Sequence, residues 1–196
     1  MWNWPSNAIY IPWTVWAVTW TVAAMWANRT VAGAGVSRQA PYRFFTTSGF
    51  VFLLIAFIGD RQPPGWMLFL FQRHWEFPLE VQWAMVGVAT LGFLFCWWAR
   101  IHLGALWSGR ITRKEGHRVV DTGPYRLVRH PIYTGILLAL LGSTMVHWYP
   151  RVVLLPVIFA YFVYAARVEE RSMREHFPKE YPIYVKRTKM LIPFLL

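Results

Sequence analysis

Five stretches of the chain contain no Asp, Glu, Lys or Arg, and their lengths constrain the fold more than any other feature of the sequence. A helix needs about 20 apolar residues, with a lower limit of roughly 17, to cross the hydrocarbon core of a bilayer. The stretches therefore predict about five transmembrane helices, of which the second and the fifth must extend into flanking residues or cross obliquely. They span residues 8–28, 44–59, 81–99, 131–150 and 152–166.

The composition favours a membrane protein over a soluble domain. Hydrophobic residues make up 56% of the chain and charged residues only 15%, whereas soluble domains contain roughly 25% charged residues. The 13 Trp, 9 Tyr and 14 Phe residues are more aromatic surface than so small a core could hide from water. Membrane interfaces, by contrast, favour Trp and Tyr. We therefore expect an all-α integral membrane protein, and the composition excludes disorder, collagen and coiled coil.

The distribution of basic residues predicts the orientation in the membrane. Of the 20 Lys and Arg residues, 17 lie in the segments 29–43, 100–129 and 167–189. The positive-inside rule assigns these segments to the cytoplasm and the N-terminus to the outside. The first span lacks a basic segment before it, so it is expected to be a retained anchor rather than a cleaved signal peptide. This topology explains the formal net charge of +11 without nucleic acid as a partner.

The last two predicted spans form an antiparallel hairpin, because only a tight turn fits between them. The final span lacks glycine over residues 151–175, so it is expected to continue as one helix into a cytoplasmic helical tail. The cytoplasmic ends of the two spans then meet and form a polar site. This geometry brings together His130, Tyr133, Arg167, Glu169 and Glu170.

The same residues also fit a structural role. Pro131 suits the first turn of a helix, where free backbone amides can receive an anionic group or simply mark a membrane boundary. Glu169 and Glu170 lie among arginines, a pattern that is equally typical of a solvated helix face. Spacing alone therefore leaves a functional site and a boundary device both open.

Other kinds of chemistry are disfavoured by the motifs. The lone Cys96 excludes thiolate zinc clusters, and the spacing of His102, His117 and His130 matches no short metal-ligand motif, so no metal is expected. The sequence contains neither a P-loop nor a complete dinucleotide fingerprint. It also contains no G-x-S-x-G elbow of a serine hydrolase.

Several motifs in the second half of the chain occur together in a familiar order. They are L-G-x-x-W-S from Leu103, G-H-R-V-V from Gly116, G-P-Y-R from Gly123 and R-H-P-I-Y-T-G from Arg129. The tail follows with E-E at Glu169, F-x-x-x-Y-x-x-Y from Phe177, and I-P at Ile192. This half resembles the isoprenylcysteine carboxyl methyltransferase and phospholipid methyltransferase superfamily. The resemblance covers residues 100–196 and predicts a methyltransferase core there, whereas residues 1–99 are expected from the charge-free stretches to form N-terminal transmembrane helices.

The resemblance implies a membrane enzyme that uses S-adenosylmethionine in a pocket facing the cytoplasm. The acceptor would be hydrophobic or lipid-like: an isoprenylcysteine carboxylate, a lipid amine or a thiol. The partners would be this acceptor and the bilayer. The residues implied to line the cofactor are His117, Arg118, Val119, Val120, Tyr125, His130, Pro131, Ile132, Tyr133 and Glu169.

The sequence departs from the family pattern near the acceptor. Ala165 stands where relatives have a substrate-binding arginine, which leaves Arg167 as the nearest replacement, and Pro178 stands where glycine is common. A carboxylate acceptor arrives charged and would be positioned by Arg167 or Arg129. A thiol or an amine must lose a proton, which would give Glu170 the role of base. The catalytic candidates are therefore Arg167 and Glu170.

Two alternatives to a methyltransferase stay open at this point. A membrane reductase of the sterol-reductase kind is distantly similar at its C-terminal end, but it uses a nicotinamide cofactor and is normally much longer. A non-catalytic membrane protein could keep the pocket for binding. Binding of S-adenosylhomocysteine, NADPH or neither separates the three.

Overall fold

The computed structural model describes residues 4–23, 25, 30–33, 65, 77–107, 112–114, 118–147 and 154–196. Within them the chain is mainly helical, which confirms the all-α prediction for its main elements. The helices are α1 (Trp4–Ala8), α2 (Tyr10–Ala23), α5 (Leu79–Leu103), α6 (Pro131–His147), α7 (Leu154–His176) and α8 (Glu180–Arg187). Short 3-10 helices span Gly104–Leu106 and Gly123–Arg126. One element was not expected: β1 (Thr30–Gly33) pairs antiparallel with β2 (Thr112–Lys114).

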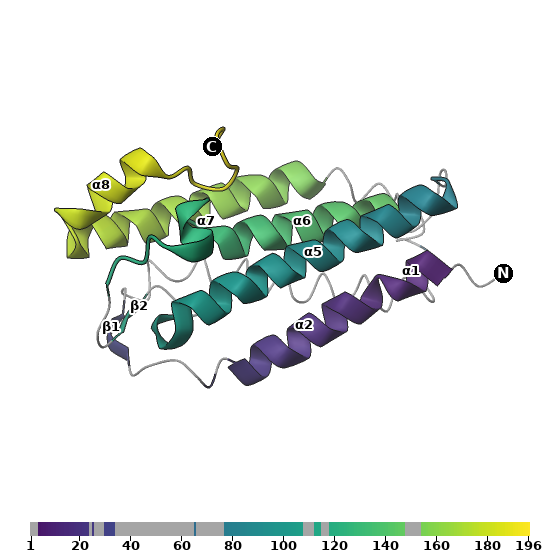
Figure 1. Ribbon diagram of the computed structural model, residues 1–196, viewed down its shortest axis with the longest axis horizontal. Coiled ribbons are helices and arrows are strands. Elements are labelled where there is room, and N and C mark those ends of the chain that lie inside the picture. The colour runs from purple at the N-terminus through teal and green to yellow at the C-terminus, as the bar shows by residue number, and fades with distance from the viewer. Residues whose placement is uncertain are drawn as a thin grey trace.

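The long helices lie roughly along one axis (Figure 1). α5, α6 and α7 run side by side, and α1 and α2 lie along α5. α8, the β1–β2 pair and the end of α5 gather at one end of the molecule, and α1 lies at the other. Residues that are far apart in sequence therefore meet at the end that contains α8.

Helix α5 is longer than the sequence suggested. It begins after Pro78, carries Glu80 in its first turn, and ends at Gly104. Gly104 adopts a φ of 57°, in the left-handed region that favours glycine, and its N–H bonds to the carbonyls of Arg100 and Ile101. The predicted cytoplasmic loop from Arg100 therefore starts later, because Arg100 is a buried residue of the helix.

Arg100 is stabilised inside the helical layer rather than by solvent. Its guanidinium donates to the carbonyls of Gly104, at 2.6 Å, and Ala23. It also lies 4.5 Å from the ring centroid of Trp107, a cation–π distance. A buried arginine of this kind needs partners for its charge, and here backbone carbonyls of two segments supply them.

Close contact between α5 and α6 depends on small residues. A Cβ on Gly135 would lie 2.5 Å from the Cys96 sulfur and from the Gly92 carbonyl oxygen. A Cβ on Gly142 would lie 2.5 Å from the Met85 carbonyl oxygen. Because these distances are shorter than any real contact, only glycine lets the two backbones approach this closely. This packing fixes the start of α6 against α5.

Of the described helices, α5 is the best suited to cross a membrane. Among the described residues, one helical segment, Leu79–Leu106, is long and apolar enough to span a bilayer, and 28% of its apolar stretch is buried in the protein. The apolar part of α6, Pro131–Val146, is shorter. The predicted span 44–59 lies outside the described residues. The number of spans therefore stays a prediction.

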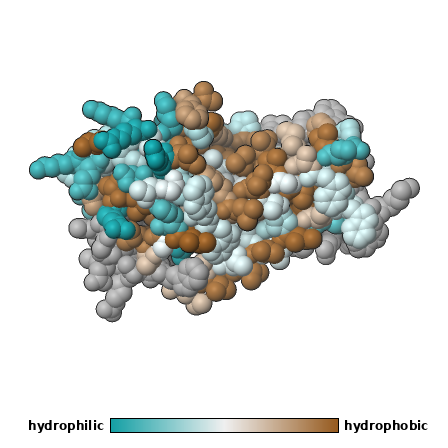
Figure 2. Space-filling view, in the orientation of Figure 1, coloured by the Kyte–Doolittle hydropathy of each residue, from teal (hydrophilic) through white to brown (hydrophobic). Residues whose placement is uncertain are grey.

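The surface divides into two regions (Figure 2). The end with α8 is hydrophilic, and hydrophobic side chains dominate the middle of the visible face. The last predicted span is confirmed as a single helix that passes from the apolar middle to the hydrophilic end, because α7 runs unbroken from Leu154 to His176. Pro156 is accommodated near the start of α7, where a missing N–H is tolerated.

Candidate functional site

The segment before α6 is held by the C-terminal tail. The Arg129 N–H donates to the Lys189 carbonyl at 2.8 Å, and the His130 N–H donates to the Met190 carbonyl at 3.1 Å. Val128 and Lys189 form a parallel bridge at the same place. Pro131 then begins the helix, where its missing N–H costs no hydrogen bond. The R-H-P motif is thus extended backbone paired to the tail and followed at once by a helix.

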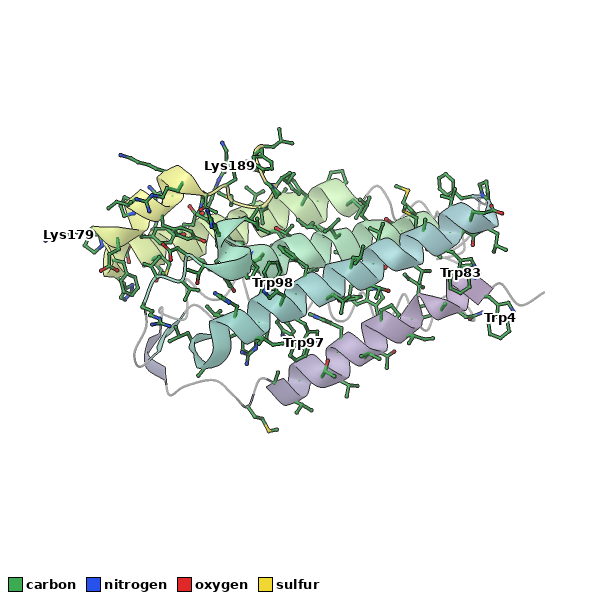
Figure 3. The ribbon with its side chains drawn as sticks, viewed as in Figure 1. Trp4, Trp83, Trp97, Trp98, Lys179 and Lys189 are labelled. Atoms are coloured by element: carbon green, nitrogen blue, oxygen red, sulfur yellow. The ribbon has the colours of Figure 1, made fainter. Side chains whose placement is uncertain are left out.

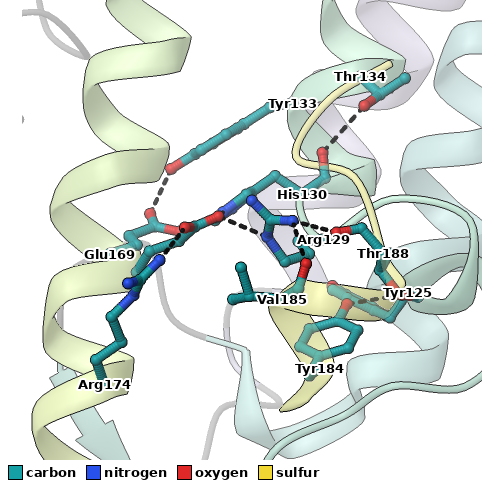
Figure 4. A network of polar contacts seen from close by, with 11 residues as sticks. Tyr125, Arg129, His130, Tyr133, Thr134, Glu169, Arg174, Tyr184, Val185 and Thr188 are labelled. Atoms are coloured by element: carbon teal, nitrogen blue, oxygen red, sulfur yellow. Dashed lines mark hydrogen bonds and ion pairs between the residues drawn. The ribbon is translucent and has the colours of Figure 1, made fainter. Parts of the chain in front are cut away.

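Two adjacent glutamates of α7 meet this segment (Figure 4). The Arg129 Nε lies 2.7 Å from Glu170 Oε1, and the His130 Nε2 lies 3.3 Å from the same oxygen. The His130 Nδ1 lies 3.4 Å from Glu169 Oε2, and the Tyr133 hydroxyl donates to Glu169 Oε1. Of the residues expected to meet here, His130 contacts both glutamates and Tyr133 contacts Glu169. Arg167, which was expected with them, is exposed.

The two carboxylates differ in their exposure to solvent. The Glu170 side chain is 6% exposed and lies beside Arg129 at 8%, whereas the Glu169 side chain is 32% exposed. Arg174, one turn along α7, places its Nη2 3.7 Å from Glu170 Oε2. Glu169 is therefore the carboxylate that a ligand can reach, and Glu170 is enclosed by cations.

Arg129, His130, Tyr133, Glu169 and Glu170 form a polar cluster. Contacts within this cluster shift the pKa values of His130 and Glu170. Burial alone would lower the pKa of His130, but contacts with Glu169 and Glu170 outweigh burial and raise it. Burial alone would raise the pKa of Glu170, but hydrogen bonds from His130 and Arg129 outweigh it and lower the pKa. Both shifts favour a charged His130 beside a charged Glu170.

Aromatic rings form one side of the cluster. The Tyr133 ring stacks on His130 with centroids 5.5 Å apart and planes within 7° of each other. Phe162 of α7 lies 4.9 Å from Tyr133. Exposed carboxylate and aromatic surface therefore occur together, which is a combination that suits a cationic, flat ligand.

The C-terminal tail, which includes α8 and the residues after it, packs against the other side of the cluster. The Tyr184 hydroxyl of α8 donates to the Tyr125 carbonyl at 2.6 Å, and the Thr134 hydroxyl donates to the Leu191 carbonyl at 2.6 Å. Burial raises the pKa of Tyr184, so its hydroxyl stays protonated as a donor. The Arg129 guanidinium also donates to the Thr188 carbonyl and, at 3.4 Å, to the Val185 carbonyl. The tail is thus a structural part of the site.

The other residues predicted from the sequence to line the site differ in their burial. Tyr125 is buried in the 3-10 helix Gly123–Arg126, and Ile132 accepts a hydrogen bond from the Cys96 thiol at 3.3 Å on the α5 side. Val119 and Val120 are half-buried. Arg118 and Arg167 are exposed. His117 lies outside the described residues.

Sequence reasoning missed the central position of Arg129 and the packing of Phe162 on Tyr133. Arg129 was considered only as a holder of the acceptor, whereas the structure commits its side chain to Glu170 and to tail carbonyls. Its place beside His130 in the R-H-P motif was the available signal. No pattern in the sequence pointed to Phe162.

Comparison with known proteins identifies the family. The family model described as "Isoprenylcysteine carboxyl methyltransferase (ICMT) family" matches residues 68–175, more than half of the chain. The chain belongs to this family. The match begins ahead of the expected boundary at residue 100, so it includes α5 as well as α6 and most of α7.

Individual relatives of this family member carry two kinds of names. Protein-S-isoprenylcysteine O-methyltransferase B of Arabidopsis thaliana is 28% identical over 88 residues, which cover 44% of this chain and 45% of the relative. Protein-S-isoprenylcysteine O-methyltransferase of Saccharomyces cerevisiae is 34% identical over 87 residues, covering 43% and 36%. Cobalt-zinc-cadmium resistance protein CzcN of Cupriavidus metallidurans is 34% identical over 125 residues, covering 62% and 52%. The matches thus span about half or less of each relative's length.

The residues matched by the ICMT family model include the polar cluster but not the tail residues that support it. The family match contains Arg129, His130, Tyr133 and both glutamates, and it stops before α8. Tyr184, which bonds to Tyr125, therefore lies beyond the matched residues although it supports the matched ones.

Proposed function

We propose that this ICMT family member transfers a methyl group from S-adenosylmethionine to a hydrophobic or lipid-like acceptor. The proposal depends chiefly on one observation: His130 and Tyr133 of the R-H-P-I-Y-T-G motif contact Glu169 of the E-E motif, although 36 or more residues separate them. A merely solvated helix face would not need a stacked tyrosine and histidine against its carboxylate.

The residues present fit the cofactor chemically. S-adenosylmethionine supplies a methyl group on a positively charged sulfonium, and it also carries an ammonium, a carboxylate and an adenine. The partly exposed Glu169 carboxylate would offset the positive charge, and the free amides after Pro131, beside the positive charge of His130, would receive the carboxylate. Val119, Val120 and the neighbouring aromatic rings would contact the adenine. We propose that His117, Arg118, Tyr125 and Ile132 complete this lining.

The charges of the site favour a carboxylate as acceptor. Arg167 is exposed on α7 two residues before Glu169, where it would hold an acceptor carboxylate. A thiol or amine would need Glu170 as base, but the pKa of Glu170 is lowered by His130 and Arg129, which makes it a weak proton acceptor. An O-methylation needs no base, because the carboxylate arrives ionised. An isoprenylcysteine carboxylate therefore fits better than a lipid amine or a thiol.

The bilayer is the proposed surroundings. We propose five spans with the N-terminus outside and the site facing the cytoplasm. A lipid-like acceptor would enter sideways between helices and present its polar end to Arg167. Alignment of the two substrates and exclusion of water are then the protein's main contributions to methyl transfer.

The test is a radiolabelled methyl transfer assay in proteoliposomes. The acceptors are a prenylated cysteine with a free carboxylate, phosphatidylethanolamine, and a long-chain thiol, each supplied with methyl-labelled S-adenosylmethionine. We expect label in the methyl ester of the prenylated cysteine. Label only in the amine or the thiol would move the proton-accepting role back to Glu170. Oxidation of NADPH in place of methyl transfer would replace the proposal with a reductase, and ligand binding without any transfer would indicate a binding protein.

A further inference from the structure

His130 lies between two carboxylates, one at each ring nitrogen. Nδ1 is 3.4 Å from Glu169 Oε2, and Nε2 is 3.3 Å from Glu170 Oε1. A neutral imidazole has one N–H and one lone pair, so it can donate to only one of two ionised carboxylates and would present its lone pair to the other. Only the imidazolium donates to both. The geometry therefore selects the charged form of His130.

Glu170 is committed to this arrangement. Its Oε1 contacts both Arg129 and His130, and its Oε2 lies 3.7 Å from Arg174. The side chain is 6% exposed. Glu170 therefore has little room for a proton from an acceptor, and its surroundings keep it ionised.

Arg129 in turn is anchored by the tail. Its guanidinium donates to the Thr188 and Val185 carbonyls as well as to Glu170. This anchoring fixes the Glu170 carboxylate relative to the start of α6. A chain of contacts therefore runs from the tail through Arg129 and Glu170 to His130, and from His130 to the accessible Glu169 (Figure 4).

We propose that Glu170 and Arg129 are positioning residues that hold His130 as an imidazolium, whose second N–H orients Glu169 for the cofactor. The role of Glu169 in this chain rests on the proposed function. The charge state of His130 does not, because it follows from contacts within the protein. The proposal assigns Glu170 a role other than base.

The charged and titratable groups around His130 determine the sign of the pH dependence. They are Arg129 before it, Tyr133 on α6, and Glu169 and Glu170 on α7, with Arg174 and Tyr181 beside Glu170. The pKa of His130 is raised in the folded protein. The contacts of the imidazolium are therefore fully present below the ordinary histidine pKa of about 6.5 and are lost as pH rises through the raised value.

The first test measures the charge of His130 without any ligand. Nitrogen NMR of histidine-labelled, detergent-solubilised protein distinguishes the imidazolium, in which both ring nitrogens are protonated, from either neutral tautomer. His130→Asn assigns the signal among the 6 histidines. We expect His130 to stay charged above pH 6.5. A His130 that is neutral there in the wild-type protein would overturn the proposal.

The second test removes the charge of Glu170. In Glu170→Gln we expect the His130 titration to move down by roughly 1 to 2 pH units, because one charge-assisted contact is lost. Glu175→Gln removes the same charge from an exposed position of the same helix, and it should leave the titration nearly unchanged. Equal titration midpoints in wild type and Glu170→Gln would refute the positioning role.

The third test links His130 to the cofactor site. Calorimetric affinity for S-adenosylhomocysteine should fall in wild type as pH rises through the His130 midpoint, and the fall should move to lower pH in Glu170→Gln. Affinity that ignores the His130 titration would refute the link to Glu169. Absence of binding at every pH would instead count against the proposed function, while the NMR result would still decide the charge of His130.

Discussion

Neighbouring residues of one type differ sharply in this site. Glu169 and Glu170 are adjacent on α7, yet one is partly exposed beside Tyr133 and the other is enclosed by Arg129, His130 and Arg174. We therefore propose that Glu169 contacts the ligand and that Glu170 supports the site.

Substitutions of Glu169 and Arg167 should have different effects: the first on cofactor binding and the second on methyl transfer. Glu169→Gln should weaken S-adenosylhomocysteine about ten- to a hundredfold, because a charge-assisted contact is worth on the order of 1.5–3 kcal/mol. Arg167→Ala should leave that affinity nearly unchanged while lowering turnover or raising the acceptor KM. Calorimetry and the radiolabelled assay on both variants measure this. Normal turnover by Arg167→Ala would remove Arg167 from the site and leave it as a headgroup anchor.

Support of the site by the tail can be measured as stability. Tyr184→Phe deletes the hydroxyl that bonds to the Tyr125 carbonyl at 2.6 Å, which leaves a buried acceptor unpaired. We expect a loss of about 1–3 kcal/mol in unfolding free energy and a lower Tm. Tyr164→Phe, at an exposed position of α7, is the matched control and should have little effect. Equal Tm values for the two variants would show that the hydrogen bond contributes nothing measurable.

At the scale of elements, the hairpin and the long final helix were predictable, but their fine positions were not. The absence of charged residues from 152–166 and of glycine from 151–175 sufficed to predict that α7 continues past the apolar region. The end of α5 was placed too early because Arg100 reads as a loop charge, whereas backbone carbonyls of Ala23 and Gly104 satisfy it within the fold. Backbone partners leave no trace in a sequence. For the same reason Arg129, which bonds to tail carbonyls, escaped notice as the centre of the cluster.

Packing of α5 on α6 should depend on glycine at specific positions. Gly142→Ala places a Cβ where the Met85 carbonyl oxygen would lie 2.5 Å away, so the helices must separate. We expect a destabilisation of about 1–3 kcal/mol, as for other overpacked positions. Gly87→Ala on α5 faces open space and should be neutral or stabilising by up to about 1 kcal/mol. Thermal unfolding of both variants compares them, and a Gly142→Ala protein as stable as Gly87→Ala would contradict the close approach.

At the scale of the whole molecule, polarity runs along the long axis (Figure 3). Trp4 and Trp83 lie together at one end, and Lys179 lies at the opposite end. Tryptophan is common at membrane interfaces and lysine on the cytoplasmic side. The basic segments predict that the end with Lys179, which is also the end with the Glu169 site, faces the cytoplasm.

The orientation can be tested by labelling single cysteines. In a Cys96→Ala background, Lys186→Cys should react with a membrane-impermeant thiol reagent from the cytoplasmic side only. Arg151→Cys, in the predicted outside turn, should react from the opposite side only. Sealed vesicles of known orientation make the comparison. Labelling of both positions from one side would break the hairpin topology, and reversed labelling would invert the predicted orientation.

We propose that the cluster around Glu169 binds S-adenosylmethionine or its demethylated product. The most direct test is the thermal unfolding of the detergent-solubilised protein with S-adenosylhomocysteine or with NADPH. A ligand that binds only the folded state at a hundred times its Kd stabilises by about 2.7 kcal/mol, which gives a clear rise in Tm. We expect this rise with S-adenosylhomocysteine, a smaller rise in Glu169→Gln at the same concentration, and none with NADPH. Stabilisation by NADPH alone, or by neither ligand, would show that the cluster does not bind the methyl donor.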